Sequence, residues 1–308
     1  MQGPWQSPGV RGMGLLAWSV VVAACVHAPP PVPRAALLDM PPPHPVNVDG
    51  MIHVPGGPFF RGSTSRNSNP DERPGSRIDV PPFLVDRFEA SAAELAECVR
   101  HGACSPEGLH DERLMGAGGQ SPHCTHEKPG FERHPANCID WYQARALCAH
   151  LGKRLPTEVE WEKAMRGSLD DRPFPWGMDP PGPSSGQVAN VADESARRQF
   201  PALRISEGYD DGWPTTAPVD SFPEGVSPHG AHNGVGNVSE WTASQYDPAA
   251  YVRFSDEAAD VATEFRVVRG SAWDSDPRVV RLSRRWVFLP TDRLHSIGVR
   301  CAADLPSR

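Results

Sequence analysis

The middle of the chain, residues 168–265, contains few segments with the periodicity of a helix or a strand. It is rich in Gly, Pro, Asp and Asn, the residues that favour turns. So long an irregular stretch is unusual inside a compact domain, because ladders of backbone hydrogen bonds normally order a chain. Something other than regular secondary structure must therefore hold this part of the protein together.

Short regular elements are expected on the N-terminal side of this stretch. Residues 51–59 alternate like a strand that is broken by a glycine turn. Residues 78–88 form a second strand-like run, and its prolines predict a position at the edge of a sheet. Residues 92–100 indicate a short helix that ends at Gly102.

Two helices with clearer boundary signals follow. Asp140 is placed to cap a helix over 141–151, and a glycine follows as a stop signal. Thr157 and Glu160 have the spacing of a capping box, which predicts a second helix that runs through Arg166. The sequence thus combines a few short strands and helices with a long irregular region.

Length and charge exclude some classes of protein. A chain of 308 residues is long enough for one large domain with a real core. Its net charge of −8 argues against nucleic acid as a partner, because phosphate binding needs a basic surface.

The N-terminus carries an export signal. Arg11 precedes an apolar run over 13–24, which is too short for a permanent membrane span but suits a signal peptide. The run ends in Val22-Ala23-Ala24-Cys25, which resembles a bacterial lipobox. We interpret residues 1–24 as a lipoprotein signal peptide and Cys25 as the site of lipid attachment. An ordinary cleaved signal peptide with an incidental Cys25 is the alternative.

Residues 25–46 are interpreted as a lipid anchor followed by a linker. Eight of the seventeen positions over 29–45 are proline, which favours an extended, semi-rigid spacer. A spacer between an anchor and a domain predicts a protein of the cell envelope, attached to a membrane by lipid on its periplasmic or outer-membrane face.

Six further cysteines fit an exported chain. An even number in an oxidising compartment predicts three disulfides, although six cysteines allow fifteen pairings. The six are Cys98, Cys104, Cys124, Cys138, Cys148 and Cys301.

Several segments of the chain carry a family resemblance. They are Ile139-Asp140-Trp141, Gly152-Lys153-Arg154-Leu155-Pro156-Thr157-Glu158, Gly236-Asn237-Val238-Ser239-Glu240-Trp241, Arg269-Gly270-Ser271-Ala272-Trp273 and Gly298-Val299-Arg300-Cys301-Ala302. Together they resemble the formylglycine-generating enzyme (sulfatase-modifying factor) family. The resemblance covers residues 47–305 and implies a single α+β domain, related to C-type lectins, with little regular structure.

The positions that carry the family's chemistry are altered in this chain. The family oxidises a cysteine of a sulfatase to formylglycine with two cysteines that bind copper, and these two positions are Ser275 and Val280 here. Two further positions of the family's pocket are Ala272 and Ser239. Copper(I) needs soft thiolate ligands, which none of these side chains supplies. No catalytic residue is therefore assigned, and copper is not expected.

The resemblance also implies one disulfide and two calcium sites. The disulfide joins Cys148 to Cys301, and short-loop pairing of the other four would give Cys98–Cys104 and Cys124–Cys138. Calcium would be held by side-chain and backbone oxygens of two sets of residues, because this ion takes six to eight oxygen ligands. The first set is Asn190, Val191, Asp211 and Trp213, and the second is Asn233, Gly236, Val238 and Glu240. Ordinary Asn, Gly and Asp turns are the alternative.

Two other clusters have weaker functional interpretations. A zinc site is one interpretation of the cysteines and histidines between His123 and Cys138 (His123, Cys124, His126, His134 and Cys138), but loop histidines beside a disulfide are favoured. Arg281, Arg284 and Arg285 are suited to clamp an anion, although structural ion pairs are favoured.

The sequence thus predicts a calcium-stabilised binding domain that has lost the family's oxidase chemistry. Its expected partners are a membrane, through the lipid anchor, and a protein or peptide ligand in the family's substrate groove. The alternative is an oxidase of altered chemistry that uses another metal at the segment from His123 to Cys138.

Overall fold

The computed structural model describes residues 48–109, 122–167, 171–253 and 264–306. All of them belong to one compact unit of the chain, residues 42–308. The predicted signal peptide, the predicted lipid-attachment residue Cys25 and the predicted linker lie outside the described residues. Within the described ranges, no helix combines the length and the apolar character needed to cross a membrane.

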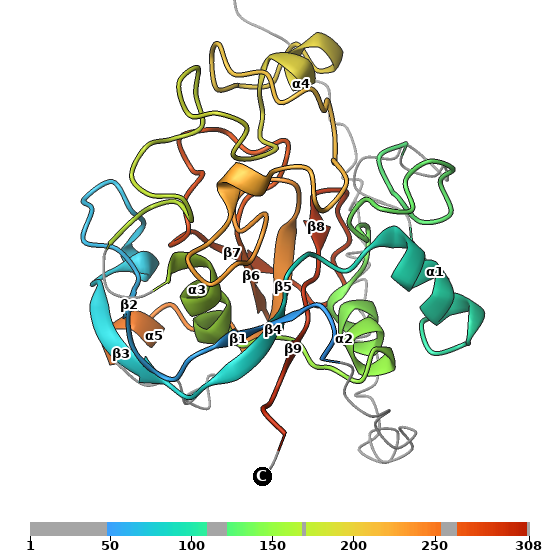
Figure 1. Ribbon diagram of the computed structural model, residues 1–308, viewed down its shortest axis with the longest axis horizontal. Helices are drawn as coiled ribbons and strands as arrows, with labels where there is room; N and C mark the ends of the chain where they lie inside the picture. Colours follow the sequence, from blue (N-terminus) through green and yellow to red (C-terminus); the bar gives the residue numbers. More distant parts are fainter. Residues whose placement is uncertain (1–47, 110–121, 168–170, 254–263, 307–308) are drawn as a thin grey trace, which may run out of the picture. The chain divides into compact units, whose positions relative to one another are not determined.

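Three small sheets make up the β structure (Figure 1). In the first sheet, β4 (Phe83–Asp86) lies between β1 (Met51–Val54) and β9 (Ala302–Ala303). The second sheet pairs β2 (Gly57–Arg61) with β3 (Ser76–Val80). The third has the order β7 (Arg285–Phe288), β6 (Arg266–Arg269), β5 (Ser239–Gln245) and β8 (Ile297–Gly298). Only β5 and β8 are parallel among these pairs, so the fold relies on antiparallel neighbours.

One prediction about the strands is wrong. The run over 78–88 was expected at a sheet edge because of its prolines, yet β4 is the central strand of its sheet. Pro81 and Pro82 lie between β3 and β4 rather than inside either strand. They therefore remove no donor from a ladder, and the rule that confines proline to edges does not apply.

The expected helices are present with their predicted caps. They are α1 (Ala92–Arg100), α2 (Trp141–His150) and α3 (Glu158–Arg166). Asp140 accepts a hydrogen bond from the backbone N–H of Gln143, and Thr157 accepts one from that of Glu160. These caps satisfy backbone donors that a helix start leaves unpaired, and they set both boundaries.

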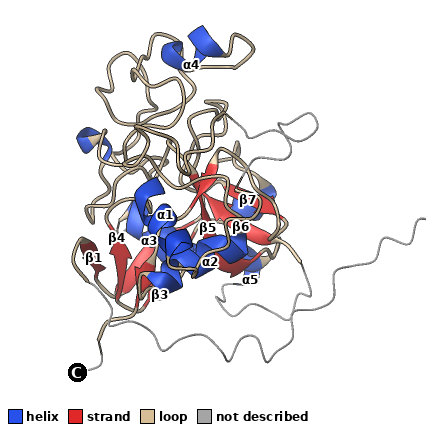
Figure 2. Ribbon diagram, turned by 90° about the vertical axis from the view of Figure 1, so that its right-hand side faces the viewer, coloured by secondary structure: helices blue, strands red, loops and turns tan. Residues whose placement is uncertain are grey.

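The predicted irregular middle is confirmed. Between α3 and β5, the helical elements of the described residues are α4 (Glu194–Gln199) and one 3-10 turn (Pro223–Gly225). A last short helix, α5 (Ala250–Arg253), follows β5. Figure 2 shows the loops around α4 as long tan segments outside the sheets. Together with the sheets, these elements confirm an α+β domain of low regular content.

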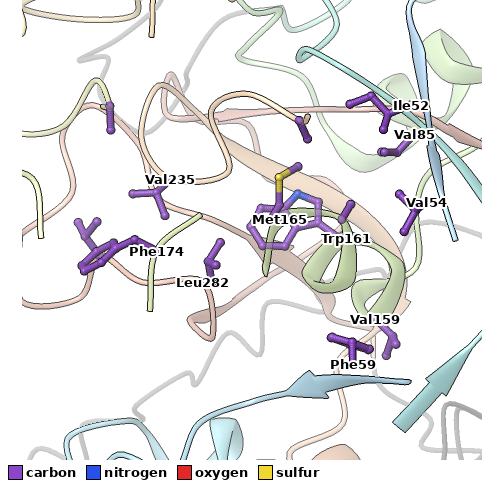
Figure 3. Packing of buried hydrophobic residues seen from close by; sticks show 14 of the residues in the cluster. Ile52, Val54, Phe59, Val85, Val159, Trp161, Met165, Phe174, Val235 and Leu282 are labelled. Atoms are coloured by element: carbon purple, nitrogen blue, oxygen red, sulfur yellow. The ribbon is translucent and has the colours of Figure 1, made fainter. Parts of the chain in front are cut away.

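Helix α3 supplies much of one hydrophobic core. Trp161 and Met165 are fully buried, with Val54 of β1 on one side and Val235 and Leu282 from loops on the other (Figure 3). Residues from the irregular middle thus complete a core begun by a helix and a strand. The loops are held partly by this apolar burial, which contributes about 25 cal/mol per Å² of apolar surface.

The same helix also carries buried charges. Glu162 accepts hydrogen bonds from Arg166 at 2.8 Å and from Arg269 of β6 at 2.6 Å. Although burial raises the pKa of Glu162, the two guanidinium groups hold it below its usual value. The ion pairs fix α3 against the third sheet, because removal of one buried partner would leave an uncompensated charge.

Candidate metal sites and the altered active-site positions

The loop after β6 contains three of the altered positions. The Ser275 hydroxyl accepts a hydrogen bond from the backbone N–H of Ala272 at 2.9 Å, so it closes a local turn. Val280 is buried in the core cluster around α3. Ser239 is buried at the start of β5. These side chains are committed to turns and packing, and none offers a thiolate.

Every cysteine among the described residues is paired. The disulfides are Cys98–Cys104, Cys124–Cys138 and Cys148–Cys301. The third is the pair that the family resemblance implies, and it joins α2 to the segment before β9. No free thiol remains in the described part of the chain to replace the missing copper ligands.

An aromatic group surrounds the altered loop. The ring of Trp273 lies 5.1 Å from that of His295, 5.3 Å from that of Phe200 and 5.8 Å from that of His123. Nε2 of His295 lies 3.0 Å from a carboxylate oxygen of Asp274. The sequence did not predict this cluster, because its members come from segments far apart in the chain and only Trp273 and His123 belong to segments that carried a signal.

Residues of the first oxygen set lie together in the structure. Asp211 accepts hydrogen bonds from the backbone N–H groups of Val191 at 3.0 Å and Trp213 at 2.8 Å. Nδ2 of Asn190 donates to the backbone oxygen of Thr215 at 2.7 Å, whereas its Oδ1 is buried without a partner. A buried amide oxygen without a partner is costly unless a cation or a water fills the space.

Asp211 lies in surroundings that favour a bound cation. Burial, and then the charge of Asp193, raise the pKa of Asp211 to about 8. Asp193 is fully buried as the N-cap of α4 and accepts a hydrogen bond from the backbone N–H of Asp211. Sequence analysis did not include Asp193, although an Asp before a short helix is a cap signal. Two neighbouring buried carboxylates fit a site for a divalent cation.

The second oxygen set lies directly against the first. The backbone N–H of Asn237 donates to the backbone oxygen of Asn190 at 2.8 Å. A Cβ atom at Gly236 would lie 2.2 Å from that same oxygen, so only glycine permits this approach. Asn233 has a buried Oδ1 without a partner. Both loops therefore present an unpaired amide oxygen in one region of the molecule.

Glu240 of the second set is already engaged. Its carboxylate accepts hydrogen bonds from the Arg300 guanidinium at 2.8 and 3.1 Å and from Trp161 Nε1 at 2.6 Å. Asn233 thus fits a calcium ligand, whereas Glu240 would have to share its charge with Arg300. The first set fits a calcium ion better than the second.

Sequence analysis also missed Glu89. This carboxylate is buried and accepts hydrogen bonds from the side chains of Asn233 at 2.7 Å and Asn237 at 3.0 Å. Burial raises the pKa of Glu89 to about 7, although Arg300 lies 3.8 Å away and opposes the rise. Glu89 also lines a cleft of about 380 Å³ together with Arg87 and other charged residues.

The two weaker clusters take structural roles. Arg281 pairs with Glu72, and Arg285 with Glu158 at 2.6 Å, whereas the Arg284 guanidinium lies over the Trp286 ring at 4.2 Å. These contacts agree with the structural interpretation of the arginines.

The proposed zinc cluster has lost its thiolates. Cys124 and Cys138 are bonded to each other. His134 lies 3.0 Å from the hydroxyl of Thr216. Within the described ranges, no three His, Cys, Asp or Glu residues are grouped to hold a metal ion.

Fold and site together define a class: a single α+β domain of mostly irregular structure, with three disulfides among the described residues and two neighbouring loops that each bury an unpaired amide oxygen. The chain belongs to the family of the sulfatase-modifying factor enzyme 1-like domain, whose model matches residues 38–305.

The chain is similar both to a relative that is named inactive and to a relative that is named an oxygenase. The chain is 30% identical to inactive C-alpha-formylglycine-generating enzyme 2 of Mus musculus, over 82% of this chain and 85% of that protein. It is 32% identical to hercynine oxygenase of Mycolicibacterium smegmatis, over 82% of this chain but only 61% of that protein. Among solved structures it is similar to PvdO from Pseudomonas aeruginosa, with a TM-score of 0.63 and 28% identity over 83% of this chain and 94% of PvdO.

Proposed function

We propose that this protein is a membrane-anchored, calcium-stabilised binding domain without formylglycine-generating oxidase activity. The loss of activity is inferred from the environment of Ser275 and Val280. Ser275 closes a turn, and Val280 is buried in the hydrophobic core. The similarity to a relative named inactive supports the same conclusion.

The loss of activity has a direct test. The purified protein is incubated with copper, oxygen and a Cys-x-Pro-x-Arg peptide, and mass spectrometry measures formylglycine against a no-protein control. We expect no product. The double variant Ser275→Cys and Val280→Cys should also stay inactive, because Ala272 and Ser239 still depart from the family pattern. An aldehyde product from the unmodified protein would refute the proposal.

Calcium is proposed for the two oxygen sets because each contains a buried amide oxygen without a partner, on Asn190 and on Asn233. The ion would supply positive charge and fill ligand positions that the protein leaves open. Asp211, Val191 and Trp213 would complete the first set. Gly236, Val238 and Glu240 would complete the second, where Arg300 competes for the carboxylate of Glu240.

The binding role is supported by a polar group beside the altered loop. The indole N–H of Trp273 is buried and has no hydrogen-bond partner. An unsatisfied donor costs about 1–3 kcal/mol, which a ligand oxygen would recover. The partly exposed rings of His123 and Phe200 beside it would contact the rest of an extended peptide or protein ligand.

Trp273→Phe provides a test, because it removes the N–H and retains an aromatic ring. We expect the wild type to capture a partner from an envelope extract and Trp273→Phe to lose that capture without any fall in its melting temperature. Equal capture by both proteins would refute a ligand at this position.

Anchoring is proposed through a lipid on Cys25, in the cell envelope. Cys25→Ser should abolish labelling by a fatty-acid probe and release the protein from the membrane fraction. Continued membrane attachment of this variant would refute the lipid anchor.

An oxidase of altered chemistry is the second candidate, because the chain is similar to a protein named hercynine oxygenase. His123 and His295 beside the altered loop are candidate ligands for another metal, whereas the disulfide of Cys124 and Cys138 removes those thiols. Metal analysis of the purified protein distinguishes the two candidates. Calcium alone supports the binding domain, and stoichiometric iron, zinc or copper supports the oxidase.

A further inference from the structure

A chain of four buried side chains connects the two oxygen sets. Nδ2 of Asn233 donates to Oε2 of Glu89 at 2.7 Å, and Nδ2 of Asn237 donates to Oε1 of Glu89 at 3.0 Å. Nδ2 of Asn190 donates in turn to Oδ1 of Asn237 at 3.4 Å, and it also donates to the backbone oxygen of Thr215 at 2.7 Å. All four side chains are buried, since each residue is at most 4% exposed. The carboxylate of Glu89 thus contacts Asn233 of the second set directly. It is connected to Asn190 of the first set through Asn237.

These hydrogen bonds fix the orientation of each asparagine amide, that is, where its nitrogen and its oxygen point. Both oxygens of Glu89 accept these hydrogen bonds, so Asn233 and Asn237 both turn their nitrogens toward Glu89. The same nitrogen of Asn233 also donates to the backbone oxygen of Val219 at 2.7 Å. Because the nitrogens of Asn233 and Asn190 are committed, their oxygens point elsewhere, and these are the two buried oxygens without a partner.

Backbone contacts make the arrangement stiff. Oδ1 of Asn237 also accepts from the backbone N–H of Ala217 at 2.9 Å. The backbone N–H of Asn237 donates to the oxygen of Asn190, and Gly236 approaches that oxygen too closely for any larger residue. Neither loop can shift without disturbing the other, because close-packed interiors transmit displacement.

We propose that Glu89 is a positioning residue that couples the two calcium sites. It orients the ligand oxygen of Asn233 directly and that of Asn190 through Asn237. The inference rests on the proposed calcium sites and adds that they bind as a coupled pair. Calcium at one site orders the shared chain, so the second ion binds a site that is already organised. Linkage requires that the effect be reciprocal.

Calcium titration of the whole protein by calorimetry, after removal of bound metal, tests the proposal. The wild type should bind two calcium ions. Glu89→Gln replaces one acceptor by a donor, so that one of the two asparagine amides loses its partner and turns. We expect calcium affinity to fall about 10–100-fold, as for other residues that orient metal ligands, and to fall at both sites.

Glu132→Gln is the matched control. Glu132 is a carboxylate that lines the same cleft as Glu89, and its side chain accepts a hydrogen bond from the backbone N–H of Gly130 rather than from the asparagine amides. This variant makes the same change of charge and should leave both calcium affinities unchanged. An equal loss in Glu132→Gln would assign the effect to the charge of the cleft and overturn the positioning role.

Asp211→Ala tests the coupling without a change to the hydrogen-bonded chain. It removes a ligand of the first site, and we expect the affinity of the second site to fall at least about fivefold, the lower range of allosteric coupling. If Glu89→Gln shows no cooperative melting transition and is therefore unfolded, the Asp211→Ala titration alone tests the coupling. The coupling would be refuted if the wild type binds two calcium ions and Asp211→Ala does not change the affinity of the second site. That result would still support the two calcium sites. A wild type that binds no calcium would overturn both proposals.

Discussion

Arg300 and Glu240 form a buried ion pair in which both carboxylate oxygens accept hydrogen bonds from one guanidinium. The distances are 2.8 and 3.1 Å, and the two side chains are 0% and 1% exposed. Arg300 also donates to the backbone oxygens of Asp86 and Arg87, at the end of β4. The charge of Glu240 is therefore balanced inside the protein whether or not a calcium ion is bound.

Glu240→Ala should consequently destabilise the protein in the presence and in the absence of calcium. The substitution leaves Arg300 buried without its partner, which costs about 3–5 kcal/mol in free energy of unfolding. Urea denaturation in excess calcium and in excess chelator measures this loss. If it disappears in chelator, Glu240 acts mainly as a calcium ligand and the ion pair is secondary.

The disulfide between Cys148 and Cys301 should be the one that contributes most to stability. It closes a loop across a sequence separation of 153 residues, against 6 and 14 for the other two. In the chain-entropy account, a loop of this length contributes about 3–5 kcal/mol. Cys148→Ser with Cys301→Ser should lower the free energy of unfolding by that amount. The control, Cys98→Ser with Cys104→Ser, should lower it by less, and equal losses would contradict this explanation.

Much of the regular structure could be predicted because its signals are local. The caps at Asp140 and Thr157 and the glycines after α2 and α3 lie within one or two turns of the boundaries that they set. The absence of such signals likewise predicted the irregular middle. The prolines at 81 and 82 led to the wrong prediction of a sheet edge. Proline removes a ladder hydrogen bond only where it falls inside a strand, and these two lie between strands.

The centre of the candidate site could not be predicted in the same way. Glu89 meets Asn233 and Asn237 across 144 and 148 residues of sequence. Trp273 and Phe200 likewise come together from separate loops. No periodicity or spacing links such residues, since their contacts depend on the packing of the complete domain. The resemblance to a family pointed to Asn190 and Asn233 as proposed calcium ligands but gave no indication of Glu89.

His134 should make the protein sensitive to acid. Burial lowers the pKa of His134 to about 4, from an ordinary value near 6.5 in the unfolded chain. The unfolded state therefore binds the proton more tightly, and the stability contributed by neutral His134 is lost as the pH falls from about 6.5 to 4. His134→Gln should cost about 2 kcal/mol less at pH 4.5 than at pH 7, as measured by urea denaturation. A cost for His134→Gln that does not change with pH would contradict the assignment.

Removal of calcium should loosen the irregular middle of the chain. A ligand that binds only the folded state raises the free energy of unfolding by about 2.7 kcal/mol at a hundredfold excess over its dissociation constant. A chelator should therefore lower the melting temperature and expose the loops between α3 and β5 to proteases. Asp211→Ala should reproduce part of this effect and make the remaining response to chelator smaller. Magnesium should not replace calcium, because it demands a regular octahedral shell that backbone oxygens of these loops do not offer. An unchanged melting curve in chelator, together with an Asp211→Ala variant as stable as the wild type, would mean that the two oxygen sets are only turn formers.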